Sequence, residues 1–289
     1  MCWLLSLLFA DTEFNQAIVF KGGTSLSKVF GVIQRFSEDI DLSLAPTYLG
    51  ISEDEAAEIA SRTQRDAWMK RLQKQCETIV HDRIRPAIEN RIHEFVLDPE
   101  TESPVILFHY PVTQASGFPY LPRNVKMEFG SLTDQRPVGM HQIRPWIADE
   151  LEDSFQDWQC DVVALELERP YWEKATILHA EYHRAPANRM PVRFSRHYAD
   201  MASLARHPET RTTVNRHDIR ERVVAWKNRF FPRSWARYDL AEPGTFRLVP
   251  PADRIAELQA DYAAMRDMYI MDPLPTGHLV NSFSSQSMN

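Results

Sequence analysis

The chain of 289 residues is poor in cysteine and contains no internal repeat. Its three cysteines are scattered along the chain and odd in number: Cys2, Cys76 and Cys160. This pattern therefore indicates neither a disulfide framework nor a zinc cluster. Sparse, unpaired cysteines suit a reducing compartment, so we expect a cytoplasmic protein.

Long apolar runs are also lacking. No stretch reaches the roughly 18 apolar residues that a membrane-spanning helix needs. The apolar run at residues 3–9 looks like the core of a signal peptide. However, no basic residues precede it, it is short, and it runs into Asp11 and Glu13 without a cleavage site. We expect a buried helix there and no membrane partner.

An overall excess of basic charge is lacking too, because the formal net charge is −7. This balance argues against a general nucleic-acid binder. However, residues 184–237 contain 13 Lys and Arg against 4 Asp and Glu, a charge of +9 that leaves −16 for the rest. Aromatic residues are interleaved with these cations, a pattern that a phosphate-rich polymer favours. The alternative is a helical region with a solvated, arginine-rich face.

Glycine is scarce as well, with nine in the chain, yet three of them fall within residues 20–44, FKGGTSLSKVFGVIQRFSEDIDLSL. The pair Gly22-Gly23 follows an apolar, strand-like run at residues 17–20. Glycine at such a turn lets backbone N–H groups approach a bulky anion, such as a triphosphate. Seen alone, a glycine pair is a common turn element.

Paired carboxylates follow this turn. The run Asp39-Ile40-Asp41-Leu42 predicts a strand in which both aspartates share one face while Ile40 and Leu42 point into the core. Two carboxylates this close repel unless a cation lies between them, and oxygen-rich sites suit Mg²⁺. A lone Asp-x-Asp is more often a solvated strand edge or loop. The order of glycine turn, spacer and paired carboxylates indicates a metal-dependent nucleotidyl transfer site.

This segment resembles nucleotidyltransferases of the DNA polymerase β type. It more closely resembles the AbiEii/AbiGii toxin family, whose members carry a segment like KGGTSLSK…RFSEDIDL. In this chain the match covers residues 21–28 and 35–42 and becomes sparser toward residue 205. Family members carry further residues before the first helix, so we expect that this chain begins late or is abbreviated.

The resemblance implies an α+β fold with a nucleotidyltransferase-type mixed sheet flanked by helices and a helical C-terminal half. We expect a nucleotidyltransferase catalytic domain at residues 1–166, with a helical insertion at about 52–97. A helical domain at 167–272 would complete the cleft, and residues 273–289 would form a loose tail.

The resemblance also implies a third carboxylate on a later strand. Glu128, in the alternating run at residues 124–130, is the candidate, although a lone Glu in such a strand usually marks its solvated face. Asp39, Asp41 and Glu128 are thus the expected catalytic and metal-binding residues, with two Mg²⁺ ions as cofactor.

Residues implied to bind the NTP by the same resemblance are Gly22, Gly23, Thr24, Ser25, Lys28, Arg35, Lys174, Arg196 and Asp200. The residues of the turn would supply backbone and hydroxyl donors, and the cations would neutralise the triphosphate. Three alternatives stay open. Arg35 could brace only Glu38, Lys174 could be a solvated helix lysine, and Arg196 and Asp200 could form a surface ion pair.

The predicted reaction moves an NMP from an NTP to an acceptor hydroxyl and releases pyrophosphate. By the resemblance, the protein is the toxin of a bacterial toxin–antitoxin or abortive-infection system. Its expected partners are a tRNA, whose 3′ end is the acceptor, and a cognate antitoxin. The open alternatives are a protein acceptor and a catalytically silent nucleotidyltransferase fold that only binds partners.

A zinc hydrolase is the rival chemistry, because His179 and His183 lie one helical turn apart. The spacing is not His-Glu-x-x-His, since Glu181 comes two residues after His179. A packed or exposed histidine pair is the favoured interpretation.

Periodicity and turn residues predict the remaining elements. The expected helices are 3–15, 24–34, a long stretch over 52–95 that Pro86 breaks or kinks, 168–184, 194–206, 215–230 and 252–269. The expected strands are 17–21, 39–44, 104–110, 124–130 and 161–166.

Overall fold

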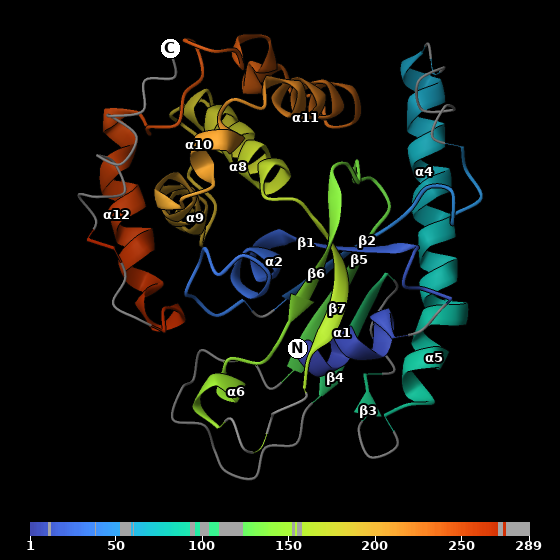
Figure 1. The fold of residues 1–289 in the computed structure, drawn as a ribbon. Helices are drawn as coiled ribbons and strands as arrows, with labels where there is room; N and C mark the ends of the chain where they lie inside the picture. Colours follow the sequence, from blue (N-terminus) through green and yellow to red (C-terminus); the bar gives the residue numbers. More distant parts are fainter. Residues whose placement is uncertain are drawn as a thin grey trace. The chain divides into compact units, whose positions relative to one another are not determined.

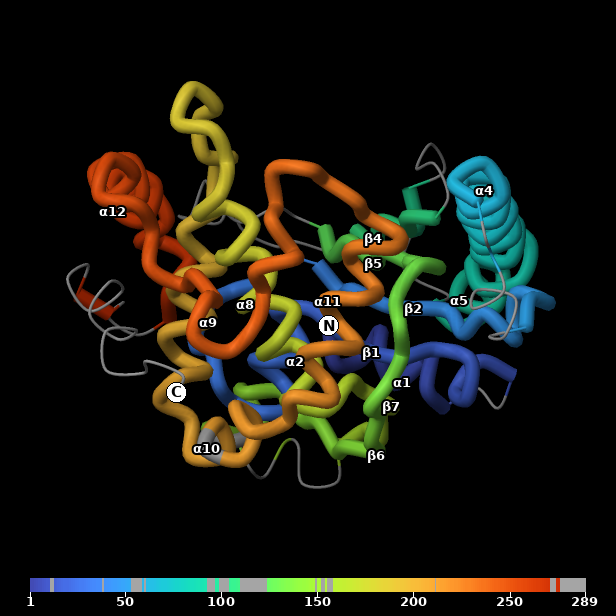
Figure 2. The backbone as a smooth tube through the Cα atoms, turned by 90° about the horizontal axis from the view of Figure 1, so that it is seen from above, coloured from blue at the N-terminus to red at the C-terminus, as the bar shows by residue number. Residues whose placement is uncertain are grey.

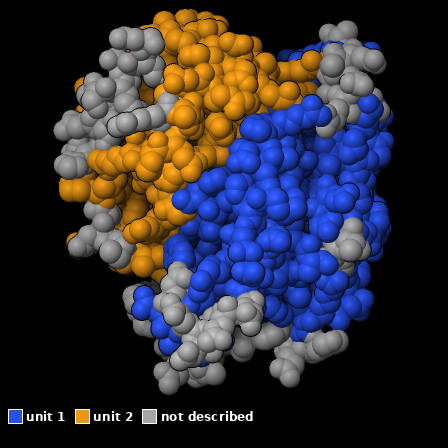
Figure 3. All heavy atoms as spheres, viewed as in Figure 1, with its two compact units in different colours: residues 1–30, 37–166 blue, residues 31–36, 167–289 orange. Residues whose placement is uncertain are grey.

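The computed structural model describes residues 1–10, 13–37, 39–52, 59, 61–92, 96–98, 104–109, 124–151, 154, 158–270 and 274–275. The chain divides into two compact units (Figure 3). Unit 1 comprises residues 1–30 and 37–166, and unit 2 comprises residues 31–36 and 167–289. The expected tail at 273–289 lies almost entirely outside the described residues.

Unit 1 is built on a mixed sheet that contains seven strands in the described part of the chain, in the order β3-β4-β5-β2-β1-β7-β6 (Figure 1). The strands are β1 (Ile18–Lys21), β2 (Asp39–Leu44), β3 (Val96–Leu97), β4 (Val105–His109), β5 (Asn124–Gly130), β6 (Val138–Ile143) and β7 (Cys160–Leu165). β2 is parallel to β5 and β1 is parallel to β7, whereas the other pairs are antiparallel. The predicted mixed sheet flanked by helices is confirmed.

Helices of unit 1 are α1 (Cys2–Phe9), α2 (Gly22–Lys28), α4 (Arg62–Ile79), α5 (Arg85–Glu89) and α6 (Ile147–Glu150). Ser61 caps α4 through a reciprocal capping box with Gln64. The interruption expected at Pro86 takes the form of a π-helical turn, Val80–Ile84, after which Pro86 lies in the first turn of α5. α4 and α5 thus form one rod, which Figure 2 shows end-on.

The two faces of the sheet differ in polarity along β2 and β5. Ile40, Leu42 and Met127 are fully buried on one face. This face is covered by helices that contact the sheet, α1 against β7 and α4 against β5. The thiol of Cys76 on α4, for example, lies 3.6 Å from the carbonyl oxygen of Phe129. The residues that alternate with this apolar set therefore lie on the opposite face.

Unit 2 is helical, with α8 (Glu168–Tyr182), α9 (Ser195–Arg206), α10 (Thr210–Thr213), α11 (His217–Phe230) and α12 (Ile255–Ala264). α8 packs against both α9 and α11, and α12 packs against α9. Residues 31–36 join this unit through the backbone. The N–H of Phe36 donates to Met268 O at 2.7 Å, and the N–H of Ile270 donates to Gln34 O at 3.1 Å.

Some boundaries differ from the sequence prediction. The helix predicted at 24–34 ends at Lys28, because the chain turns at Gly31, whose φ is +63°. The helix predicted at 3–15 ends at Phe9. β3, β6, α6 and α10 were not predicted. No helix that the structure describes is long and apolar enough to cross a bilayer.

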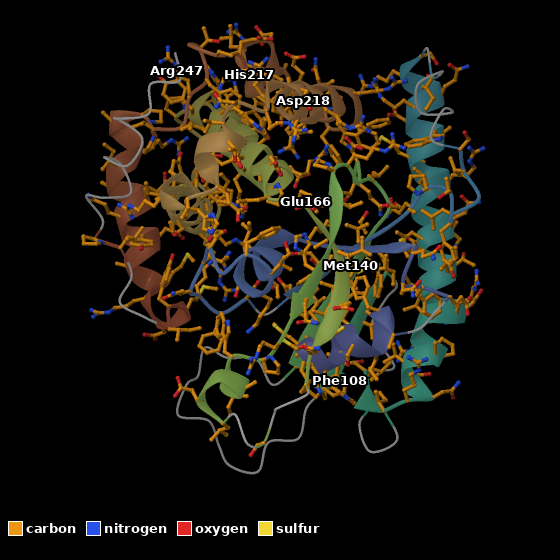
Figure 4. The ribbon with its side chains drawn as sticks, viewed as in Figure 1. Phe108, Met140, Glu166, His217, Asp218 and Arg247 are labelled. Carbon is orange, nitrogen blue, oxygen red and sulfur yellow. The ribbon has the colours of Figure 1, made fainter. Side chains whose placement is uncertain are left out.

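Replacing Ile40 by Ala should lower the free energy of unfolding by about 2–5 kcal/mol, because it opens a cavity beneath the central strand. The matched control is Met140→Ala on the edge strand β6 (Figure 4), where the side chain is 69% exposed. We expect that control to stay within about 0.5 kcal/mol of wild type. Urea unfolding followed by circular dichroism measures both, and equal losses would contradict the described core.

Candidate functional site

The three predicted acidic residues of the site lie together on one face of the sheet. In the strand register, Asp41 is paired with Glu128 of β5 on one side and with Lys21 of β1 on the other. Directly paired residues share a face, and residues two apart on one strand do so as well. Asp39, Asp41 and Glu128 therefore project from the middle of the sheet. All three are partly exposed.

The glycine turn touches this acidic cluster. Gly22 adopts φ +80°, a conformation that residues with a Cβ rarely occupy. A Cβ built on Gly22 would lie 2.0 Å from Oδ2 of Asp41. Only glycine therefore allows the turn to approach the carboxylate this closely, and Gly23 follows it in the first turn of α2.

The two hydroxyls after the glycines brace the turn from within. Thr24 and Ser25 are almost completely buried. The hydroxyl of Thr24 donates to Asp39 O, and that of Ser25 donates to Gly22 O at 2.9 Å. The first bond joins α2 to the beginning of β2, so the turn and the carboxylates are held to each other by the protein itself.

A lysine that the sequence analysis did not identify lies among the carboxylates. Lys126 is in register with Asp39 and forms an ion pair with Glu128, two residues further along β5. The hydrogen bond to Glu128 raises the pKa of Lys126. Partial burial opposes the rise, and the charges of Glu128, Asp39 and Asp41 add to it. The alternation of residues 124–130, which identified Glu128, also places Lys126 on the same face. The sequence pattern could therefore have identified Lys126 as well.

The chemistry of this donor set fits a divalent cation. Carboxylate oxygens are the ligands that Mg²⁺ prefers, and all three carboxylates act on one ammonium, that of Lys126. Within the described part of the chain, no three His, Cys, Asp or Glu side chains converge closely enough to form a finished metal site. The residues thus provide suitable donors, one of which is engaged by a lysine.

Lys28, a predicted phosphate ligand, is the last residue of α2, the helix that begins at the glycine turn. Its Nζ is 3.5 Å from the centre of the Trp146 ring, a cation–π contact. This contact gives the ammonium an aromatic partner within the protein.

Three of the predicted nucleotide-binding residues meet in the interior of unit 2. Nε and Nη2 of Arg35 donate to the two carboxylate oxygens of Asp200, each at 2.9 Å. Nζ of Lys174 donates to Oδ2 of Asp200, also at 2.9 Å. The side chains of Arg35 and Asp200 are only 4% and 1% exposed, so this is a buried bidentate pair with a second cation attached.

The structure tests the purely structural roles that the sequence left open for these residues. The surface ion pair between Arg196 and Asp200 is wrong, because Asp200 is buried and binds Arg35 and Lys174. Arg196 is partly exposed and pairs with no carboxylate that the structure describes. Arg35 pairs with Asp200. Glu38, the alternative partner of Arg35, lies outside the described residues.

Electrostatics fix the charge states in this cluster. Burial favours a neutral Asp200, but Arg35 and Lys174 outweigh it and hold the pKa of Asp200 well below its usual range. Lys174 donates to Nδ1 of His197 at 3.1 Å. Burial and the charge of Lys174 lower the pKa of His197 well below its usual value, so the imidazole is neutral.

A second cationic group beside Lys174 was not predicted. Arg169 donates through Nε to Glu173 at 2.9 Å, and Nζ of Lys227 donates to the Glu173 carbonyl oxygen at 3.3 Å. Burial lowers the pKa of Lys227 to about 8. No sequence pattern linked Lys227 to Lys174, because the contact between α8 and α11 is tertiary.

The histidine pair at the C-terminal end of α8 is structural. The backbone N–H of Arg247 donates to Nδ1 of His179 at 3.1 Å, and Nε2 of His179 donates to Arg237 O at 2.9 Å. His179 is fully buried, and the His183 ring packs against it. Because both ring nitrogens of His179 are engaged by the backbone, it cannot serve as a zinc ligand in this fold.

Part of the basic charge of residues 184–237 is neutralised inside unit 2. Arginines of this segment form ion pairs with neighbouring carboxylates: Arg184 with Glu181, Arg216 with Asp218, Arg220 with Glu242, and Arg237 with Asp239. Asp218 is labelled in Figure 4. The exposed pairs contribute little to stability.

The comparison with protein-family models agrees with the sequence resemblance. The family model described as nucleotidyl transferase AbiEii toxin, Type IV TA system, matches residues 3–285. Among solved structures, the chain is similar to MenT4, a nucleotidyltransferase toxin from Mycobacterium tuberculosis H37Rv, at 14% identity and a TM-score of 0.36. That match covers 91% of this chain and 90% of the other. No curated protein matches the chain.

Replacing Asp200 by Asn should destabilise the protein by about 3–5 kcal/mol at pH 7, because it leaves Arg35 and Lys174 buried without their anion. The folded-state pKa of Asp200 is depressed, so its contribution is present above its unfolded pKa, about 4, and fades as the pH falls below that value. The difference in the free energy of unfolding between wild type and variant should therefore become smaller only at acidic pH.

Urea unfolding between pH 3 and pH 8 measures this difference. Asp253→Asn is the control, since Asp253 is exposed in unit 2. A D200N variant that is as stable as D253N at pH 7 would contradict the buried network.

Proposed function

The chain belongs to the AbiEii nucleotidyl transferase toxin family, and on this premise we propose that it transfers an NMP from an NTP to an acceptor hydroxyl with release of pyrophosphate. Family membership establishes that the protein is a nucleotidyltransferase; the site residues, metal dependence and acceptor are our proposal. One observation carries it. The positive-φ turn at Gly22 lies directly against the Asp41 carboxylate, as a site that holds a metal-bound phosphate requires.

We assign metal binding to Asp39, Asp41 and Glu128, which would hold two Mg²⁺ ions. The bound ions would supply charge stabilisation for the entering and leaving oxygens of an in-line displacement. The protein contributes the register of β1, β2 and β5, which sets the three carboxylates side by side. Glu128, on the neighbouring strand β5, would also orient the acceptor hydroxyl for loss of its proton.

Triphosphate binding is assigned to the turn and to cations of the predicted set. Backbone N–H groups of Gly22, Gly23, Thr24 and Ser25 would face the phosphates, while the two hydroxyls hold the turn in place. Lys28, Lys174 and Arg196 are the proposed neutralising cations. Arg35 and Asp200 would act indirectly, because Asp200 fixes the ammonium of Lys174 and is itself fixed by Arg35.

The family is that of a toxin in a Type IV toxin–antitoxin system, which implies a cognate antitoxin. We propose that the acceptor is the 3′ end of a tRNA and that the protein acts in the cytoplasm. The formal charge of +9 in residues 184–237 supports an RNA partner, because phosphate contacts dominate affinity for nucleic acids. A protein acceptor is the second candidate, and the experiment below separates the two.

Wild-type protein incubated with Mg²⁺, total tRNA and each labelled NTP should transfer label to tRNA. Asp41→Asn should lower the rate by about 10³-fold, since losing a metal ligand removes several kcal/mol of transition-state stabilisation. The control is Asp161→Asn, an exposed carboxylate near the beginning of β7, which β1 separates from β2.

Three results would revise the proposal. Label on protein alone would favour a protein acceptor. Absence of transfer to any acceptor, with NTP binding retained, would indicate a catalytically silent fold. Wild-type turnover in D41N, with D161N also unchanged, would remove Asp41 from the site.

Replacing Gly22 by Ala should also abolish most transfer, because the new Cβ would push the Asp41 carboxylate out of place. Gly50→Ala is a matched control: Gly50 also has a positive φ, +71°, but nothing lies within 4 Å of its Cβ position. Both variants carry a similar backbone strain of about 1–2 kcal/mol. Equal activity of the two variants would show that contact with Asp41 is not what Gly22 provides.

A further inference from the structure

We infer that Lys126 is the counter-cation of the carboxylate cluster in the metal-free protein, and that a divalent cation must displace its ammonium from Glu128 in order to bind. The inference rests on the proposed function, since it takes Asp39, Asp41 and Glu128 as the metal ligands. It adds a positioning residue that controls when those ligands are available.

Lys126 lies beside the three carboxylates that we propose as metal ligands. It lies two residues before Glu128 on β5 and in register with Asp39 on β2, so its side chain projects from the face that carries the carboxylates. It forms an ion pair with Glu128, and the negative charges of Asp39 and Asp41 also reach its ammonium. One ammonium thus interacts with all three candidate ligands.

Charge explains why such a group is needed. Three carboxylates from adjacent strands repel one another unless cations lie nearby. Two lysines share their face, Lys126 and Lys21. Lys21 is paired in register with Asp41. However, its side chain extends toward Gly130, because Cε of Lys21 lies 4.0 Å from a Cβ built on Gly130. Of these two lysines, Lys126 forms an ion pair with Glu128 of the cluster.

Exposure allows the ion pair to open. The side chains of Lys126 and Glu128 are 38% and 40% exposed, so the ammonium can leave Glu128 for water at little cost. An ammonium that stabilises three carboxylates also repels a divalent cation at the same place. Lys126 should therefore stabilise the metal-free protein and weaken its affinity for metal.

The test is Lys126→Met, compared with wild type and with Lys70→Met. Lys70 is an exposed lysine on α4 of the same unit, so its replacement changes the net charge equally but away from the cluster. Thermal unfolding is recorded first in EDTA and then across a Mg²⁺ titration, with Lys126→Arg as the variant that keeps the charge.

We expect K126M to have a lower Tm than wild type and K70M in EDTA. It should reach half of its Mg²⁺-induced rise in Tm at a Mg²⁺ concentration about three- to tenfold lower, as loss of a positive charge beside the carboxylates predicts. K126R should behave like wild type. An unchanged or higher Mg²⁺ requirement in K126M would overturn the inference.

Failure of this inference can be told apart from failure of the proposed function. If Mg²⁺ raises the Tm of wild type but not of D41N, the carboxylates bind the metal, and an unchanged requirement in K126M then counts against the role of Lys126 alone. If Mg²⁺ leaves the Tm of wild type and D41N equally unaffected, the metal site itself fails, and both ideas fail with it.

Discussion

The alternation of side chains along β2 is the constraint on which the rest of the site depends. Asp39 and Asp41 can stand together only because Ile40 and Leu42 are buried on the other face. A slip of one residue in the pairing of β2 would bury two carboxylates and expose two apolar side chains, so the core selects the register. The same register then brings Glu128 and Lys126 from β5 beside them. Packing on one face thus determines the chemistry on the other.

Unit 2 also has a carboxylate that needs compensating positive charge, but this carboxylate is buried. Its acidic group, Asp200, is buried, and it is compensated by Arg35 from the segment 31–36 and by Lys174 from α8. Arg35 and Asp200 are 165 residues apart in the sequence. Removing either cation would leave a buried charge without its full complement, so the network holds three segments of unit 2 to one another. It also fixes the ammonium of Lys174, which we propose as a phosphate ligand.

Much of this could be predicted from the sequence, and the failures have physical causes. β2 and β5 were predicted with their observed bounds, because their alternation is regular and one face is fully buried. β6 was missed because it is an edge strand, where Val138 and Met140 are exposed and Gly139 interrupts the pattern. The partners of Asp200 could not be predicted, since local spacing favoured Arg196 one turn away. The strand alternation that identified Glu128 could also have identified Lys126, but a lysine two residues from a carboxylate matches no sequence motif.

The two ion pairs of the site residues differ in burial, and this difference matches their proposed tasks. Arg35 and Asp200 are almost completely shielded from water, so opening their pair would strand two charges in the interior at a cost of several kcal/mol. Lys126 and Glu128 are more than one-third exposed, so water can replace either partner and the pair is worth at most about 1 kcal/mol. A contact that positions a phosphate ligand must persist through each reaction cycle. A contact that occupies a metal ligand must open whenever the metal enters. Burial, rather than the identity of the charged groups, separates these two behaviours in one chain.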